Sequence, residues 1–159
     1  MFSPERHIKR CDGGFSRYYL SCDYGTVNPF SLGLWGECDG KWYRLDEYYY
    51  SGRDNGIQLT DEEYYRELER LANGKDITAL IIDPSAASFI QTVLRHKKFR
   101  VIKANNDVLS GINRVCQALK DGEIFIYPCC ADAIREFSIY RWDDSIKRMR
   151  LKKENDHAM

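Results

Sequence analysis

Apolar and polar residues alternate through the first third of the chain, which predicts strands rather than helices. Residues 18–23 form a short strand that ends in an acid, and residues 30–35 alternate apolar with polar or small side chains. The dipeptide Asp39-Gly40 separates this second segment from the aromatic-rich run 41–50, as in a two-residue hairpin turn. The sequence therefore predicts one strand followed by an antiparallel hairpin.

Further along the chain, helical spacing alternates with short apolar runs. Residues 60–63 have the pattern of a capping box that opens a helix, and Gly74 is a suitable stop. The run 79–82 is apolar at consecutive positions, which is typical of a strand covered on both faces. The same alternation predicts a helix over 89–94, a strand over 100–103, a helix from Asp107 to Leu119, a strand over 124–126 and a helix through Ile134 and Phe137.

A hairpin followed by β-α-β units predicts an α/β fold with a mixed sheet. We expect antiparallel strands on one side of this sheet, parallel strands on the other, and helices on both faces. Right-handed crossovers would place the strands of Leu20 and Leu80 side by side and parallel. Residues 1–17 have no periodic pattern and are expected to form a linker, so the predicted domain covers 18–159.

Composition limits the possible functions. The 159 residues are 43% apolar and 30% charged, as in one globular domain, and 24 basic residues balance 24 acidic ones, so nucleic-acid binding would have to be local. No apolar run approaches the ~20 residues that span a bilayer, and no signal-peptide pattern opens the chain, so we expect a cytoplasmic protein with no membrane contact. The six cysteines form no C-x-x-C pair, which argues against structural zinc; we expect them to pack as small apolar groups.

Two acids follow apolar strands and are candidates for metal binding. Asp23 and Asp83 would emerge together if their strands are neighbours, at the strand ends where open α/β sheets bind ligands. Carboxylates favour hard ions such as Mg²⁺ or Mn²⁺, which implies a phosphate ester as the substrate. The alternative interpretation makes Asp23 a turn residue and Asp83 the N-terminal cap of a helix.

Four segments, in order and spacing, resemble the nuclease domain of tailed-phage terminase large subunits. They are Tyr19 to Gly25, Ile81 to Ala86, Lys103 to Ile112 and the closing Asn155-Asp156-His157-Ala158-Met159. The resemblance implies an RNase H-like fold and an endonuclease that cuts concatemeric double-stranded DNA during genome packaging. It also implies an ATPase domain, a small terminase subunit and a portal as partners. The chain itself contains no G-x-x-x-x-G-K-[ST] phosphate loop.

The resemblance assigns roles to individual residues. Asp23 and Asp83 match the family's catalytic acids, which would bind two Mg²⁺ or Mn²⁺ ions for phosphodiester hydrolysis. The family's third acid follows the His-Ala-Met motif, whereas this sequence stops at Met159. Either the domain is truncated just before this ligand, or Asp156 substitutes for it, or the chain is not catalytically competent as it stands. His157 matches a histidine near the metals and would have a supporting catalytic role.

Basic side chains near the end of the chain are candidates for DNA contacts. The predicted phosphate-binding residues are Lys103, Arg141, Lys147, Arg148, Arg150, Lys152 and Lys153. A solvated surface balanced by nearby acids is the alternative for this cluster. Two other functions remain open: a different RNase H-like nuclease, such as a junction resolvase, or a non-catalytic docking module of the packaging machine.

Overall fold

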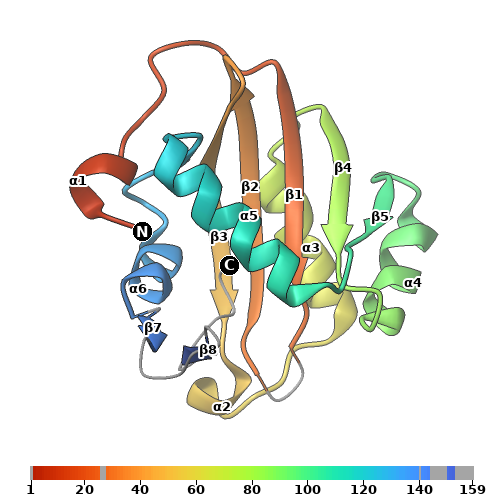
Figure 1. Cartoon of the computed structure of the whole chain (residues 1–159). Helices are drawn as coiled ribbons and strands as arrows, with labels where there is room; N and C mark the ends of the chain where they lie inside the picture. The colour runs from red at the N-terminus through yellow and green to blue at the C-terminus, as the bar shows by residue number, and fades with distance from the viewer. Residues whose placement is uncertain (1, 26–27, 140, 144–149, 153–159) are drawn as a thin grey trace.

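A mixed sheet of six strands forms the centre of the molecule, shown as a computed structural model in Figure 1. The structure describes residues 2–25, 28–139, 141–143 and 150–152. The strands are β1 (Arg17–Asp23), β2 (Phe30–Cys38), β3 (Lys41–Tyr50), β4 (Ile77–Ile82), β5 (Val101–Lys103) and β6 (Ile124–Ile126). Their order is β5-β4-β1-β2-β3-β6, with β1 to β3 antiparallel, β4 and β5 parallel to β1, and β6 parallel to β3.

Helices cover both faces of this sheet. They are α1 (Pro4–His7), α2 (Gly52–Asn55), α3 (Asp61–Ala72), α4 (Ala87–His96), α5 (Val108–Asp121) and α6 (Ala131–Ile139), and the short strands β7 (Arg141–Asp143) and β8 (Arg150–Lys152) pair with each other. Helices α3 and α4 lie against one face, called here the α3/α4 face (Figure 1). Helix α5 crosses the opposite face, called here the α5 face.

Local sequence explains where the main elements begin and end. Asp39 and Gly40 both have positive φ, 51° and 72°, which is the geometry that a tight hairpin between β2 and β3 requires. Helix α3 begins at the predicted capping box, in which the Thr60 side chain accepts from the Glu63 N–H and the Glu63 carboxylate accepts from the Thr60 N–H. The helix ends at Ala72, two residues before Gly74.

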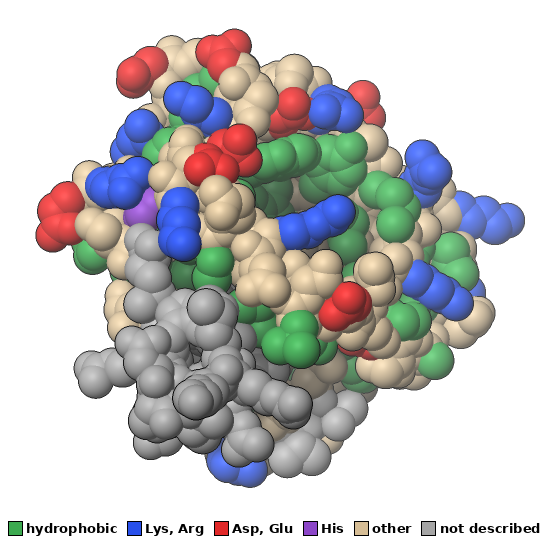
Figure 2. All heavy atoms as spheres, in the orientation of Figure 1, with side chains coloured by type: hydrophobic (Ala, Val, Ile, Leu, Met, Phe, Trp, Pro, Cys, Tyr) green, Lys and Arg blue, Asp and Glu red, His purple; other side chains and the backbone are tan. Residues whose placement is uncertain are grey.

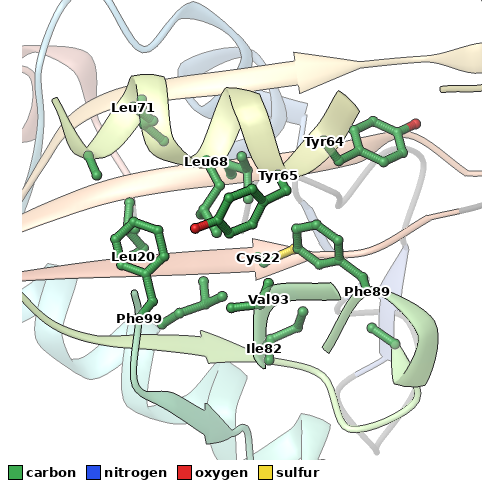
Figure 3. Packing of buried hydrophobic residues seen from close by; sticks show 14 of the residues in the cluster. Leu20, Cys22, Tyr64, Tyr65, Leu68, Leu71, Ile82, Phe89, Val93 and Phe99 are labelled. Carbon is green, nitrogen blue, oxygen red and sulfur yellow. The ribbon is translucent and has the colours of Figure 1, made fainter. Parts of the chain in front are cut away.

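The α3/α4 face contains the main apolar core. Figure 3 shows side chains of α3 and α4, among them Leu68 and Phe89, packed against Leu20 and Ile82 of the sheet. Each of these four side chains is completely buried. This face therefore provides most of the apolar burial that stabilises the fold.

The N-terminal residues pack along the β6 side of the sheet. The buried His7 ring accepts from the Ser3 N–H at Nδ1 and donates from Nε2 to the Leu119 carbonyl, each at 2.9 Å. The Lys9 N–H donates to the Ile126 carbonyl, so this segment extends the sheet beside β6. The proposed domain boundary at residue 18 stays a prediction.

The predicted α/β class, with a mixed sheet and helices on both faces, is confirmed. Leu20 pairs directly with Leu80, so β1 and β4 are the parallel neighbours that the sequence predicted. The expectation that the run 79–82 is covered on both faces is wrong for Ile81, which is 37% exposed. Its side chain lies on the α5 face, opposite to the core residue Ile82 that follows it. Within the described part of the chain, no helix is long and apolar enough to span a membrane.

Candidate metal site

The two candidate acids follow paired positions on adjacent parallel strands. Cys22 of β1 pairs with Ile82 of β4, and Asp23 and Asp83 are the residues that follow them in the chain. Neighbouring strands lie about 4.8 Å apart, so this register brings the two acids to the same edge of the sheet. Both side chains are half-buried. The strand adjacency on which the predicted pairing of the two acids depends is therefore present in the fold.

Side-chain alternation places Asp23 on the α5 face, while Asp83 directly follows the last residue of β4. Cys22 and Ile82 point into the core on the α3/α4 face, and in a strand the next side chain points to the opposite face. Asp23, still within β1, pairs with Ser31 of β2 and belongs to the same row as Ser21. Two carboxylates that emerge together at the carboxyl ends of parallel strands form an all-oxygen donor set, which suits a hard divalent ion.

The turn after β4 fixes the backbone around Asp83. Its Oδ1 accepts from the Ser85 N–H at 2.7 Å, and the Ala86 N–H donates to the Asp83 carbonyl. The N-cap position of α4 is occupied by Ala86, so the alternative interpretation of Asp83 as the helix cap is wrong. Asp83 instead organises the turn that leads into α4. The turn interpretation of Asp23 does not hold either, because Asp23 is part of β1.

A buried arginine lies on the α5 face beside the row that contains Asp23. Arg44 of β3 is 2% exposed, and its Nη2 donates to the Leu32 carbonyl. A Cβ atom on Gly33 would lie 2.5 Å from Arg44 Nη1 and 2.8 Å from Ser21 Oγ. Gly33 is therefore the position that lets the guanidinium lie across β2 and approach Ser21 of β1. Trp35 completes this arrangement by donating from its indole N–H to Ser21 Oγ at 3.0 Å.

Glu47 connects this arginine to helix α6. Its carboxylate accepts from Arg44 Nε at 3.3 Å and from the Asp132 N–H at 2.8 Å, in the first turn of α6. Burial raises the pKa of Glu47, while Arg44 and the helix N–H groups act in the opposite direction. The β2–β3 register shifts at Leu45, which has no partner on β2. Because of this extra residue, Arg44 and Glu47 point to the same face although they are three residues apart.

Sequence reasoning missed this buried ion pair. The run 41–50 alternates aromatic and charged residues, and a regular strand would place residues 44 and 47 on opposite faces. No residue type in the run marks the irregularity that brings them together. The one available signal was Gly33 in the middle of an apolar strand, because such a glycine often marks a close approach of another group.

The remaining predicted site residues are divided between described and undescribed parts of the chain. Lys103 is exposed and pairs with Ile82, in the row on the face opposite to Asp23. Arg141 lies on β7, and Arg150 and Lys152 lie on β8, where Arg141 pairs with Lys152. Residues outside the described part are Lys147, Arg148, Lys153, Asp156 and His157. Among the residues that are described, no group of three or more His, Cys, Asp or Glu side chains could hold a metal ion.

Apolar side chains remain exposed beside the acid pair. Ile81 and Ile102 are paired neighbours on β4 and β5, and Val108 and Leu109 lie in the first turn of α5. Leu119 is the one buried side chain along α5, all of whose residues are described. Figure 2, which views the α5 face, shows hydrophobic side chains and isolated basic side chains next to one another.

Comparison with solved structures shows what the chain resembles. The large terminase of a thermophilic bacteriophage, solved in complex with ADP, is 42% identical over 98% of this chain, with a TM-score of 0.88. This chain spans about 40% of that terminase chain. The resemblance to phage large terminases that the four sequence segments predicted is therefore confirmed. No family model matches the sequence. No curated protein matches it either.

Two more distant structures share the fold. The nuclease domain of the P22 large terminase is 15% identical over 98% of this chain and 84% of its own, with a TM-score of 0.72. The nuclease domain of the large terminase of bacteriophage SPP1, a structure with bound Mn, is 20% identical over 90% of this chain and 81% of its own, with a TM-score of 0.58. At these identities the likeness concerns the fold alone.

Proposed function

Since this chain is similar, over nearly its whole length, to part of a phage large terminase, we propose that it is the nuclease part of such an enzyme. In this proposal it cuts concatemeric double-stranded DNA during genome packaging, with Mg²⁺ or Mn²⁺ as cofactor, in the host cytoplasm. The ATPase domain, the small terminase subunit and the portal would be its partners. The observation that carries the proposal is the register of β1 and β4, which pairs Cys22 with Ile82, the residues directly before Asp23 and Asp83.

The donor set at the sheet edge fits divalent metal ions. Asp23 and Asp83 offer carboxylate oxygens that are half-buried, where an anion is stabilised by a bound cation. When bound, two such ions would supply an activated water and stabilise the leaving oxygen of the phosphodiester. The chain's own part is to hold its carboxylates at fixed positions on two adjacent strands, with the Asp83 backbone fixed by its turn. Asp156 would complete the ligand set, and His157 would orient water or phosphate.

Local positive charge has to supply the affinity for DNA, because the chain is neutral overall. We assign phosphate contacts first to the predicted basic residues from Arg141 to Lys153, of which Arg141, Arg150 and Lys152 belong to the β7–β8 pair. Lys103 would contribute less, since its row faces away from Asp23. Phosphate contacts of this kind carry no sequence preference, and affinity should fall steeply with salt.

The decisive experiment measures metal binding and cleavage together. Mn²⁺ should raise the Tm of the wild-type chain, and Asp23→Asn should lose both this shift and Mn²⁺-dependent nicking of plasmid DNA while remaining folded. The matched control is Asp39→Asn in the hairpin turn, where φ is 51° and asparagine is well tolerated, so shift and nicking should be retained.

Each result separates the competing functions. Nicking that persists in Asp23→Asn contradicts the assignment of this acid. A wild-type chain that shows neither a Tm shift nor nicking favours the docking module. Cleavage of four-way junctions in preference to linear duplex favours a resolvase.

A further inference from the structure

Two cysteines far apart in the sequence lie in contact at the hairpin end of the sheet. Cys11 belongs to the N-terminal segment, and Cys38 is the last residue of β2. Their sulfur atoms are 2.6 Å apart, and neither is part of a disulfide in the structure. A disulfide bond is about 2.05 Å long, so a movement of about half an ångström would join them.

The surroundings hold this sulfur pair in place. The Cys11 N–H donates to the Tyr127 hydroxyl, and the Gly13 N–H donates to the Cys11 sulfur, both at 3.3 Å. A Cβ atom on Gly13 would lie 3.2 Å from the Cys38 sulfur, so a glycine leaves room for the two sulfur atoms to meet. Cys11 is half-buried and Cys38 is buried.

A cavity of about 270 Å³ gives access to the pair. Both cysteines line it, together with Lys9, Arg10 and Lys41, and with Asp12 and Asp39. The three basic side chains suit a small oxidant that carries carboxylates, such as glutathione disulfide.

We propose that Cys11 and Cys38 are a redox-active dithiol, which a small-molecule disulfide oxidises to a cross-link between the N-terminal segment and the β2–β3 hairpin. This proposal is independent of the function proposed above. None of the residues involved belongs to the candidate metal site.

The reaction is two thiol–disulfide exchanges. The thiolate of Cys11, the more exposed sulfur, attacks one sulfur of the oxidant and releases one thiolate. Contact with Cys11 raises the pKa of the Cys38 thiol to about 11, so Cys38 is the sulfur that keeps its proton until the second step. After losing that proton, Cys38 attacks the Cys11 sulfur of the mixed disulfide and releases the second thiolate. Two electrons pass from the cysteines to the oxidant, and the two protons end on the released thiols.

The experiment treats the purified chain with glutathione disulfide at mildly alkaline pH. Non-reducing peptide mapping should find Cys11 linked to Cys38, with the intact mass lowered by two hydrogen atoms relative to the reduced chain. A bond between Cys11 and Cys38 closes a loop across 27 positions of the chain and restricts the unfolded state. The Tm should therefore rise by about 5–10 °C and return to its starting value after reduction.

Cysteine variants test whether Cys11 and Cys38 form the cross-link and cause the Tm shift. Cys11→Ser should lose the cross-link and the Tm shift, and Cys116→Ser, which replaces a half-buried cysteine of α5, should retain both. Glutathione adducts without the internal link, a link that involves another cysteine, or an unchanged Tm after oxidation would each overturn the proposal. Because folding of the reduced variants is followed by the same melting curves, a misfolded variant is recognised directly.

Discussion

The two faces of the sheet are built from different kinds of side chains. On the α3/α4 face, completely buried apolar residues such as Leu68 and Phe89 form a continuous core. On the α5 face, the buried groups include the ion pair of Arg44 and Glu47, while Ile81 remains exposed. Burying a charge costs free energy unless it is paired, whereas burying apolar surface is favourable. The α3/α4 face therefore provides most of the stability of the fold, and the α5 face carries the polar and charged groups from which a functional site can be built.

This difference locates the candidate site. Asp23 lies on the side where the sheet carries polar groups and where Ile81 remains exposed, and Asp83 follows the neighbouring strand at the same edge. The proposed substrate, a DNA duplex, is large and would need an uncovered face. The apolar face, closed by α3 and α4, offers no such surface to the acids.

The largest loss of stability is expected on the α3/α4 face. Phe89 is completely buried and its ring contacts those of Tyr24 and Phe30, with centroids 5.6 and 5.5 Å away. Phe89→Ala should lower the free energy of unfolding by about 3–5 kcal/mol, measured by urea denaturation. The control is Leu94→Ala on the same helix, where the side chain is 46% exposed and the loss should stay below about 1 kcal/mol. Equal losses would mean that this face is not the main core.

A smaller but coupled loss is expected on the α5 face. Arg44→Met leaves the buried Glu47 carboxylate without its cation and should cost about 3 kcal/mol. Adding Glu47→Gln removes the uncompensated charge and keeps an acceptor for the Asp132 N–H, so the double variant should be more stable than Arg44→Met alone. Strictly additive losses in this double-mutant cycle would show that the two side chains are not energetically coupled.

Most of the fold was predictable because its signals are local. Asp39-Gly40 specifies a turn with positive φ, and the capping box at Thr60 specifies a helix start, whatever the rest of the chain does. The pairing of Leu20 with Leu80 followed from the handedness of crossovers. Ile81 was predicted wrongly because an apolar run does not show how completely a neighbouring helix covers it.

The candidate site was predictable only in part. Asp23 and Asp83 could be found because acids at the ends of apolar strands stand out in a sequence. Arg44 and Glu47 could not, because their common orientation depends on a register irregularity between β2 and β3. The contact of Cys11 with Cys38 was missed for the same kind of reason, since it depends on the path of an irregular segment with no periodic pattern.

The smallest predicted effect is on the pH dependence of the free energy of unfolding, which should differ between a carboxylate on the α5 face and one on the α3/α4 face. Burial raises the pKa of Glu47 on the α5 face above its ordinary 4.5, so the folded chain holds this proton more tightly than the unfolded chain does. The resulting stability is present below about pH 4.5 and is lost as pH rises through the folded-state pKa. The free energy of unfolding of the wild type should therefore fall relative to that of Glu47→Gln as pH increases above about 4.5.

Glu63, at the start of α3, provides the control of opposite sign. Hydrogen bonds from Thr60 lower its pKa below 4.5, so its contribution is present above the unfolded-state pKa and is lost as pH falls through the folded-state pKa. Relative to Glu63→Gln, the wild type should therefore gain stability as pH rises toward about 4.5 and then stay level. Urea denaturation of the three proteins in small pH steps measures both differences. The prediction is contradicted if the stability difference between wild type and Glu47→Gln does not change with pH, or if it rises with pH as the Glu63 difference does. Either result would show that the Glu47 carboxylate is as well stabilised by its partners as the exposed carboxylate of Glu63.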